Sequence, residues 1–464
     1  MTTSDPLPAA VFKAYDIRGV VPQQLNPAFA HQLGWALAQV AHQENVSTLV
    51  VGYDGRHSSP ALSQALQAGI WSGGIDTLDL GMVPTPLVYF AAHTQETGSG
   101  IAITGSHNPP EYNGFKIMMA GKTLHGADIQ KLRTIMAGWP DRSTAAKQGQ
   151  GRHLDIVDSY IQRVVGDIKL GRPMKIAIDC GNGVGGVLAE RLFTALGCEV
   201  ETLYTTVDGD FPNHHPDPAN PDNLQDLIQR VQATGCELGL AFDGDADRLG
   251  VVTLSGEIIW PDRQLILYAQ DILERQPGAT IIFDVKCSRH VARSIKLAGG
   301  EPLMWQTGHS MIKAKLAETG APLAGEMSGH IFFKERWFGF DDGLYTGARL
   351  LEILSRHDDP SALLEALPQD ISTPELKLEM QEGQPHALIT RLQAEASFPS
   401  AASLNTIDGV RAEYADGFGL ARASNTTPVV VLRFEGNTQE ALERIQDEFR
   451  AALMALAPGI TLPF

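Results

Sequence analysis

The chain has 464 residues, too many for one hydrophobic core, so we expect three or four domains. Its 43% hydrophobic and 19% charged residues are typical of a globular protein and argue against a fibrous or disordered chain. The net charge of −18 argues against binding to nucleic acids or anionic membranes, which require clustered basic side chains. It does not exclude an anionic small molecule held in a local basic pocket.

The N-terminal segment and the cysteines indicate where the protein works. MTTSDPLPAAVFKAYD lacks the basic and apolar segments of a secretory signal, and no later apolar run is long enough to span a bilayer. We therefore expect a cytoplasmic protein. The cysteines form no C-x-x-C pair, which argues against a zinc site or a disulfide framework. We expect all four to be buried and reduced: Cys180, Cys198, Cys236 and Cys287.

Three stretches repeat one pattern: an apolar strand ending at an aspartate, a turn, a helix and a second strand. They read TLVVGYDGRHSSPALSQALQAG, MKIAIDCGNGVGGVLAERLFTALG and TIIFDVKCSRHVARSIKLAGG, with Asp54, Asp179 and Asp284 at the strand ends. A further apolar strand and a polar loop follow each repeat: SGIAITGSHNP, LGLAFDGDAD and APLAGEMSGH. This alternation favours mostly parallel sheets covered by helices, with ligands bound beyond the carboxyl ends of the strands.

The C-terminal part has a different pattern. DGVRAEYADGFGLARASNTTPVVVLRFEG alternates like hairpin strands, and TQEALERIQDEFRAAL has the period of an amphipathic helix. We therefore predict an α/β fold with three similar mixed-sheet α/β domains and a smaller C-terminal α+β domain. The predicted domains are residues 1–152, 153–256, 257–369 and 370–464.

The polar loop TGSHNPP follows the apolar strand GIAI, so Ser106 should lie exposed at a strand end. A serine there can be a nucleophile or phosphoryl carrier if a cation and a base flank it, and the alternative is an ordinary turn serine beside His107. Asn113-Gly114 marks a tight turn that could bring Lys116 back towards Ser106. Lys116 would there neutralise a phosphoryl group, and the alternative is a solvated surface lysine.

The strongest local signal is DGDADR, in which Asp243, Asp245 and Asp247 alternate directly after an apolar strand. Such spacing can converge oxygens on Mg²⁺, which takes few protein carboxylates and leaves room for water or phosphate. An EF-hand is excluded, because its loop positions 6 and 12 would be Arg248 and Leu254 instead of Gly and Glu. The alternative is a turn capped by aspartates, which the repulsion of three carboxylates disfavours without a cation.

Two later loops can recognise a sugar phosphate. GEMSGH places Glu326 between small residues, where its carboxylate can accept hydrogen bonds from two vicinal hydroxyls. RASNTT puts the guanidinium of Arg422 beside hydroxyl and amide donors, which suits a phosphate dianion. Each could instead be an ordinary polar turn. Further polar groups near the same class of strand ends are Tyr15, Arg18, Arg248, Lys286 and His309.

With these motifs the chain resembles the α-D-phosphohexomutase superfamily, and most closely its bacterial phosphomannomutase/phosphoglucomutase branch. The resemblance covers nearly the whole chain and rests on KAYDIRG, TGSHNPPEYNGFK, DGDADR, TGHSMIK, GEMSGH and RASNTTP. It implies four domains around a central cleft, each contributing one loop. It also implies interconversion of hexose 1-phosphate and hexose 6-phosphate, for mannose and glucose, through a phosphoserine and a hexose 1,6-bisphosphate.

The resemblance assigns a role to each loop. Ser106 would carry the phosphoryl group and would bind Mg²⁺ together with Asp243, Asp245 and Asp247. Sugar hydroxyls would be held by the third-domain loop, which comprises Glu326, Met327, Ser328, Gly329 and His330. The resident phosphate would be bound by Arg422, Ala423, Ser424, Asn425 and Thr426. Further substrate contacts would come from Tyr15, Arg248, Lys286 and His309. Proton transfer is assigned to Lys116 or His107, with electrostatic help from Arg18 and with His309 as a lesser candidate.

The expected partners are phosphorylated hexoses, with glucose 1,6-bisphosphate as an activator, and we expect a monomer that binds neither nucleic acid nor membrane. The nearest rival is phosphoglucosamine mutase, whose phosphoserine typically follows an alanine where this chain has Gly105. A metal-dependent phosphomonoesterase would release free phosphate and leave RASNTTP without a purpose. A catalytically inactive paralogue is disfavoured, because all of these motifs occur together.

Overall fold

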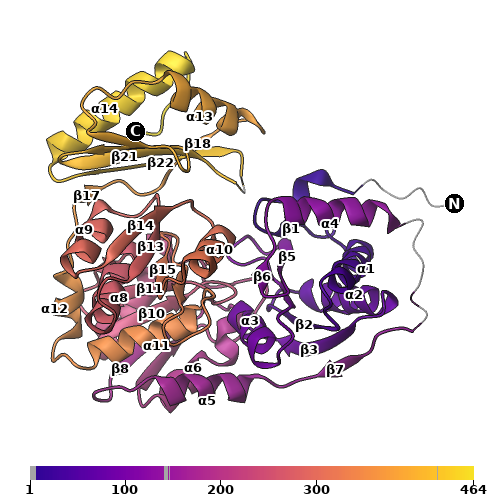
Figure 1. Ribbon diagram of the computed structural model, residues 1–464. Coiled ribbons are helices and arrows are strands. Elements are labelled where there is room, and N and C mark those ends of the chain that lie inside the picture. Colours follow the sequence, from indigo (N-terminus) through magenta and orange to yellow (C-terminus); the bar gives the residue numbers. More distant parts are fainter. Residues whose placement is uncertain (1–6, 140–144, 146, 426) are drawn as a thin grey trace.

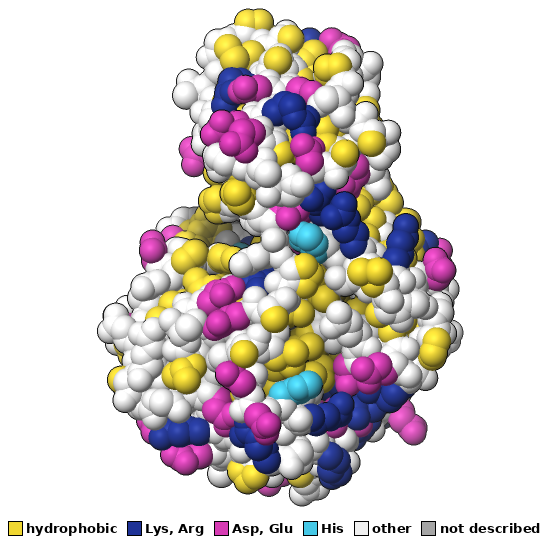
Figure 2. Space-filling model, turned by 90° about the vertical axis from the view of Figure 1, so that its left-hand side faces the viewer, with side chains coloured by type: hydrophobic (Ala, Val, Ile, Leu, Met, Phe, Trp, Pro, Cys, Tyr) yellow, Lys and Arg dark blue, Asp and Glu magenta, His cyan; other side chains and the backbone are white. Residues whose placement is uncertain are grey.

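The computed structural model describes residues 7–139, 145, 147–425 and 427–464 (Figure 1). Three α/β units form the body of the molecule, and a C-terminal unit with an antiparallel sheet lies above them in the view of Figure 1. Figure 2 shows this unit as a smaller lobe joined to the body by a narrower waist. The predicted fold class is therefore confirmed.

The first unit has a sheet in the order β1-β5-β4-β2-β3-β7, with β6 paired to β5. Its strands are β1 (Ile17–Val20), β2 (Thr48–Tyr53), β3 (Asp76–Met82), β4 (Gly100–Ile103), β5 (Tyr112–Met119), β6 (Lys122–Thr123) and β7 (Gly151–His153). Its helices are α1 (Pro27–Gln43), α2 (Ser59–Ser72), α3 (Thr85–Thr94) and α4 (Ala127–Ala137).

The second unit has the strand order β12-β11-β10-β8-β9 and the third β14-β13-β15-β16. The second comprises α5 (Val157–Asp167), β8 (Lys175–Asp179), α6 (Ala189–Ala195), β9 (Glu199–Leu203), α7 (Gln225–Thr234), β10 (Leu238–Phe242), β11 (Leu249–Thr253) and β12 (Ile258–Ile259). The third comprises α8 (Pro261–Arg275), β13 (Thr280–Asp284), α9 (Arg289–Leu297), β14 (Glu301–Trp305), α10 (His309–Thr319), β15 (Leu323–Gly325), β16 (Ile331–Phe333), α11 (Gly343–Leu354) and α12 (Pro360–Glu365).

The predicted repeat is present in all three sheets. The strand of each repeat that leads to the aspartate lies between two parallel neighbours: β2 between β3 and β4, β8 between β9 and β10, and β13 between β14 and β15. The next strand along the chain then pairs antiparallel, as β5, β11 and β16 do. Each unit therefore presents an equivalent loop after β4, β10 or β15, and these loops carry Ser106, the aspartates of DGDADR and Glu326.

Helices α1 and α2 approach each other closely over the first sheet. A Cβ atom on Gly34 would lie 2.1 Å from the carbonyl oxygen of Leu66, and one on Gly69 would lie 2.0 Å from that of His31. Only glycine fits where two helix backbones meet at this distance, so the pair is set by two glycines and by the apolar residues around them.

We expect Gly34→Ala to lower the stability of the first domain by about 1–3 kcal/mol, because the new methyl group would separate the two helices. Gly166→Ala in α5 is the matched control, since no heavy atom lies within 4 Å of its Cβ position. That variant should gain up to about 1 kcal/mol from helix propensity. Thermal unfolding measures both, and equal melting temperatures for the two variants would contradict the close approach.

Helix α11 belongs to the third unit by sequence but also covers the sheet of the second. It packs on β10 and β11 as well as on α8 and β16. Gly347 faces Phe193 and Leu240 of the second unit, and one continuous apolar cluster includes many core residues of the second and third units together with some of the first, such as Phe90. The second sheet also includes β12, which lies past the predicted limit at residue 256. The domain limits remain predictions.

The fourth unit is an antiparallel sheet in the order β17-β22-β21-β20-β19, with β18 paired to β22 and with α13 and α14 packed on the sheet. Its elements are β17 (Ile371–Ser372), β18 (Leu376–Glu379), α13 (Gln384–Glu395), β19 (Ser403–Asn405), β20 (Val410–Tyr414), β21 (Gly417–Ala423), β22 (Val429–Gly436) and α14 (Gln439–Leu456). Buried arginines attach it to the loop after β13: Arg411 donates to the carbonyls of Val285 and Cys287 at 2.6 Å, and Arg433 donates to that of Lys286.

The cysteines and the helices bear on what the composition predicts. All four cysteines are buried and unpaired, as predicted. Within the described part of the chain, no helix combines the length and the apolar character needed to cross a bilayer.

Candidate functional site

Ser106 lies in the loop after β4 with a φ of 49°, a left-handed conformation that is uncommon for a residue other than glycine. Its Oγ lies 3.3 Å from Asp243 Oδ2 and 3.2 Å from His107 Nδ1. The prediction of an exposed serine is wrong, because the side chain is only 3% exposed. The loop 243–248 of the second unit covers it so closely that a Cβ on Gly244 would lie 2.3 Å from the carbonyl oxygen of Ser106.

Asp243, Asp245 and Asp247 are fully buried, and each offers a carboxylate oxygen within 4.8 Å of the others. Burial raises the pKa of Asp243 to about 7 and also raises that of Asp247. The Oδ1 atoms of Asp245 and Asp247 are buried and accept no hydrogen bond from the described residues. Such a set of hard oxygen donors with unused lone pairs fits a divalent cation such as Mg²⁺.

Lys116 reaches this cluster from the neighbouring strand. Its Nζ donates to Asp245 Oδ2 at 2.7 Å and to Asp247 Oδ2 at 2.5 Å. The predicted tight turn at Asn113-Gly114 is wrong, since both residues lie within β5 and pair with β1. Strand β5 runs antiparallel to β4, which places Lys116 opposite Ala102, near the end of the strand that leads to Ser106. Burial disfavours its charge, but the two aspartates hold the pKa of Lys116 well above its usual value.

His330 brings the loop 326–330 of the third unit against the acidic cluster. Its Nδ1 lies 3.1 Å from Asp341 Oδ2 and 3.5 Å from Asp247 Oδ1. Burial opposes its protonation, but Asp247 and Asp341 outweigh burial and raise its pKa. Lys313 Nζ in turn donates to Asp341 Oδ1 at 2.7 Å. His309 Nδ1 is 3.7 Å from Asp341 Oδ2, and burial lowers the pKa of His309 well below its usual value.

Sequence reasoning missed Asp341 and Lys313. They contact predicted residues because Asp341, which pairs with Phe332 in a β-bridge, lies beside Lys313 of α10. A possible signal was the acidic pair Asp341-Asp342 directly after the aromatic run WFGF, ahead of a helical pattern.

Asp342 gives a pH-dependent prediction. It caps α11 by accepting from Tyr345 N at 2.9 Å, and Tyr160 OH donates to it at 2.8 Å, but burial raises its pKa to about 7. The fold therefore favours the neutral carboxyl, and the stability that this group contributes is fully present below about pH 4 and is lost as the pH rises through 7. We expect the free energy of unfolding of the wild type to fall on the order of 1–3 kcal/mol more between pH 5 and pH 7.5 than that of Asp342→Asn.

The measurement is the melting temperature of the wild type and of Asp342→Asn at both pH values. Asparagine remains a good helix cap, so the variant should fold. Other buried carboxyls, Asp243 and Glu326, contribute equally to both proteins, and only the difference between the two slopes reports on residue 342. Parallel slopes would show that Asp342 is ionised in the fold.

Arg248 joins the loop 243–248 of the second unit to the loop 326–330 of the third. Its Nε donates to Asp243 Oδ2 at 2.9 Å, and its Nη1 donates to the carbonyl of Ser328 at 3.3 Å. Gly329 has a φ of 105° and packs against the Arg248 side chain, while Met327 N donates to Asp284 Oδ1 at 3.0 Å. The loop 326–330 is therefore fixed to both the second and the third units.

Glu326 connects this loop to the α10 end of the third unit. It is 1% exposed, it accepts a hydrogen bond from Gly308 N, and burial raises its pKa to about 7. The preceding residue, Thr307, donates its N–H to Asp408 Oδ2 at 2.9 Å and accepts from Tyr15 OH at 2.6 Å. Residues 307 and 308 therefore contact the first and the fourth units at once.

The fourth-unit loop lies at the same junction. Arg422 Nε donates to Asp408 Oδ2 at 2.9 Å, and its buried Nη2 has no hydrogen-bond partner among the described residues. Asn425 donates to Tyr15 OH, and Ser424 N donates to the carbonyl of Val429 at 2.9 Å. Ala423 ends β21, and Thr426 lies outside the described residues. A cavity of about 390 Å³ adjoins Ser424 and Asn425.

Two more predicted residues have local partners. Lys286 Nζ donates to Glu375 Oε2 at 3.0 Å, across the junction of the third and fourth units. Arg18 donates to Asn108 Oδ1 and to Asp16 Oδ2, each at 2.5 Å, so it braces the loop that carries Ser106. The described predicted residues thus form one chain of contacts through all four units.

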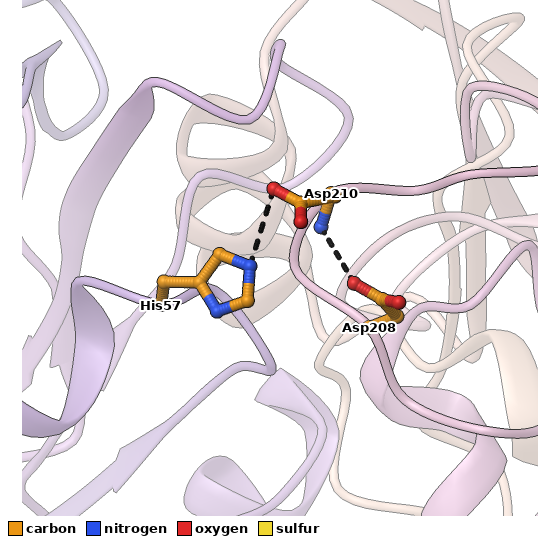
Figure 3. A group of neighbouring side chains, drawn as sticks. All are labelled: His57, Asp208 and Asp210. Atoms are coloured by element: carbon orange, nitrogen blue, oxygen red, sulfur yellow. Dashed lines mark hydrogen bonds and ion pairs between the residues drawn. The ribbon is translucent and has the colours of Figure 1, made fainter.

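A further group of possible metal ligands lies at the surface. His57 Nε2 is 3.2 Å from Asp210 Oδ1, and Asp210 N donates to Asp208 Oδ1 at 3.0 Å (Figure 3). The side chains of His57 and Asp210 are 69% and 73% exposed. Such an exposed group is a solvated contact between loops, and we assign no metal to it.

Four family models match the chain in order. They describe the phosphoglucomutase/phosphomannomutase α/β/α domain I at residues 9–142, domain II at 158–256, domain III at 260–371 and the C-terminal domain at 375–452. The chain belongs to the phosphoglucomutase/phosphomannomutase family. This confirms the predicted family and class of enzyme, a mutase that interconverts hexose phosphates.

Relatives within this family match nearly the full length. A phosphoglucomutase of Neisseria gonorrhoeae is 56% identical over 96% of each chain. A phosphomannomutase/phosphoglucomutase of Pseudomonas aeruginosa is 52% identical over 99% of this chain and 98% of its own. The crystal structure of a phosphoglucomutase/phosphomannomutase family protein from Burkholderia thailandensis superposes with a TM-score of 0.94, at 55% identity over 99% of this chain and 100% of its own.

Proposed function

We propose that this mutase is Mg²⁺-dependent and moves a phosphoryl group between O1 and O6 of glucose and mannose through a phosphoserine at Ser106. The observation that carries the proposal is the position of Ser106 Oγ, 3.3 Å from an aspartate of a buried three-carboxylate cluster that retains unpaired oxygens. A serine with a purely structural role in a turn would not require three buried carboxylates beside it.

The acidic cluster and Ser106 would have separate roles in phosphoryl transfer. Asp243, Asp245 and Asp247, with a phosphoryl oxygen on Ser106, would hold Mg²⁺, which neutralises charge on the transferring group. Phospho-Ser106 donates its phosphoryl group to the free hydroxyl of a hexose 1- or 6-phosphate, which gives the 1,6-bisphosphate. After the bisphosphate has reversed its orientation in the site, its other phosphoryl group returns to Ser106.

Proton transfer has two candidates near Ser106. His107 Nδ1 lies 3.2 Å from Ser106 Oγ, within reach of a proton on that oxygen. Lys116 is engaged by Asp245 and Asp247, so its cation lies where it can offset the charge of a phosphoryl group. Arg18 and His309 retain the supporting roles predicted for them.

The remaining loops would hold the substrate. Glu326 would accept hydrogen bonds from sugar hydroxyls, with Met327, Ser328, Gly329 and His330 around it and with Lys286 nearby. The unpaired Nη2 of Arg422 would donate to the phosphate that does not react, together with Ser424, Asn425 and Thr426. The same site would accept either end of the sugar, because the two phosphates exchange positions between the half-reactions.

The surroundings of Gly105 disfavour the phosphoglucosamine branch. A Cβ at this position would lie 2.3 Å from the guanidinium of Arg56, so the alanine typical of that branch does not fit this loop. We also propose glucose 1,6-bisphosphate as the activator, a monomer and a cytoplasmic location.

The test is a coupled assay with Mg²⁺ and a trace of glucose 1,6-bisphosphate. Glucose 1-phosphate, mannose 1-phosphate and glucosamine 1-phosphate are offered separately, and free phosphate is monitored. Conversion of the first two without release of phosphate supports the proposal. Preference for the amino sugar would assign the chain to the glucosamine branch, and released phosphate would indicate a phosphomonoesterase.

A further inference from the structure

Arg56 is a buried arginine whose two terminal nitrogens, Nη1 and Nη2, both bind one loop. It follows β2 in the sequence DGR and is 1% exposed. Its Nη1 donates to the carbonyls of Pro109 at 2.5 Å and Tyr112 at 2.9 Å, and its Nη2 donates to those of Ser106 at 2.9 Å and Asn108 at 2.6 Å. Four carbonyls of the loop 106–112 thus converge on a single guanidinium.

Asp54 holds the Arg56 side chain in place. Its Nε donates to Asp54 Oδ2 at 3.1 Å, and the same oxygen accepts from Gly105 N at 3.0 Å. Asp54 Oδ1 accepts from Ser59 Oγ at 2.6 Å, at the start of α2. The end of β2 and the start of α2 therefore form a rigid base from which Arg56 reaches the loop.

The second unit closes over the other side of Arg56. The ring of Phe211 lies 5.2 Å from the guanidinium carbon, and His215 Nε2 bonds to the carbonyl of His107. A Cβ on Gly55 would lie 2.1 Å from Val207 Cγ1, so the turn also touches the second unit directly. The contact of His57 with Asp210 continues the same junction at the surface (Figure 3).

Ser106 needs such support because its left-handed φ of 49° is intrinsically unfavourable. The guanidinium binds the carbonyl of Ser106 itself and those of the residues after it, and it does so in a planar fork that a lysine ammonium cannot reproduce. The orientation of Oγ towards the acidic cluster thus depends on a side chain that touches neither metal ligands nor Ser106 Oγ.

We propose that Arg56 is a positioning residue for phosphoryl transfer: it holds the loop 106–112 so that Ser106 Oγ faces the metal cluster while the second unit covers it. This inference rests on the proposed role of Ser106 as the phosphoryl carrier. A misplacement of about 1 Å can cost about 100-fold in rate, so the effect of losing Arg56 should appear in kcat.

The test compares Arg56→Lys with Arg263→Lys. Arg263 is a matched control, because it is 3% exposed and donates to the carbonyls of Leu364, Glu365 and Leu367, away from the site. We expect Arg56→Lys to lower kcat about 100-fold with little change in KM, and to slow phosphorylation of Ser106 by glucose 1,6-bisphosphate to the same degree. In Arg263→Lys the melting temperature should fall by a similar amount, but kcat should remain that of the wild type.

Gly105→Ala is the second variant, and it decides the matter if Arg56→Lys does not fold. It retains Arg56 but displaces the guanidinium, because the new Cβ would lie 2.3 Å from it. The same fall in kcat at unchanged KM supports the proposal. Wild-type kcat in Arg56→Lys or in a folded Gly105→Ala, or equal losses in Arg56→Lys and Arg263→Lys, would overturn it. Ser106→Ala separates the role of Arg56 from that of Ser106. Undiminished turnover in that variant would refute the proposal that Ser106 carries the phosphoryl group.

Discussion

Ser106→Ala is expected to lower the rate of hexose phosphate interconversion on the order of 10⁴-fold or more, because it removes the oxygen that would carry the phosphoryl group. The fold should survive, since within the described part of the chain the Oγ is hydrogen-bonded to His107 and Asp243 alone. The coupled assay with glucose 1-phosphate measures the loss. Incubation with labelled glucose 1,6-bisphosphate should leave the variant unlabelled.

Ser63→Ala is the matched control for this experiment. Ser63 is also a buried serine of the first unit, 2% exposed, and its Oγ accepts a hydrogen bond from Gln67 Nε2 at 3.3 Å. This variant should retain both turnover and label. Label in Ser106→Ala, or turnover within about tenfold of the wild type, would assign the phosphoryl carrier to another residue.

Removal of the metal is expected to lower turnover about 10³-fold, because a bound divalent ion contributes several kcal/mol of charge stabilisation to phosphoryl transfer. Dialysis against a chelator should stop the reaction, and added Mg²⁺ should restore it. Asp245→Asn should weaken ion binding directly, since Asp245 Oδ1 is one of the unpaired buried oxygens. Electron paramagnetic resonance of added Mn²⁺ measures that binding without reference to activity.

Asp208→Asn provides the control for the metal experiment. Asp208 belongs to the other acidic group near the junction of the first two units, but that group lies at the surface (Figure 3). Its loss should leave Mn²⁺ binding and Mg²⁺ dependence unchanged. If Asp208→Asn weakened binding as much as Asp245→Asn, the surface group would be the metal site instead of DGDADR.

The parts of the fold that were predictable are those with a local pattern. The three repeats are visible because each apolar strand runs into an aspartate, and the C-terminal helix because its apolar residues recur with the helical period. Ser106, Asp243 and Glu326 could be singled out for the same reason, since each follows a buried strand. Ligands of such sheets bind beyond the carboxyl ends of the strands, so position after a strand was enough to single out one loop in each of the three sheets.

The residues that were missed depend on contacts between distant segments. Arg56 reads as part of a turn, and only the packing of the loop 106–112 on that turn shows what it binds. Lys116 was placed near Ser106 for a wrong reason, because Asn113-Gly114 is a common turn signal that strand pairing overrides here. The burial of Ser106 could not be foreseen either, since a loop of another unit produces it.

Helix α11 has a consequence for dissecting the protein into fragments. A fragment that ended with the second unit would lose the helix that covers β10 and β11, and it would leave apolar residues such as Leu240 without their cover. The chain contains four family domains, but autonomous folding does not divide along the same lines. A fragment from α5 to α12 would keep that cover, but it would still lose first-unit residues such as Phe90 that belong to the same apolar cluster. We therefore expect fragments cut at the limits of the family domains to expose apolar core to water.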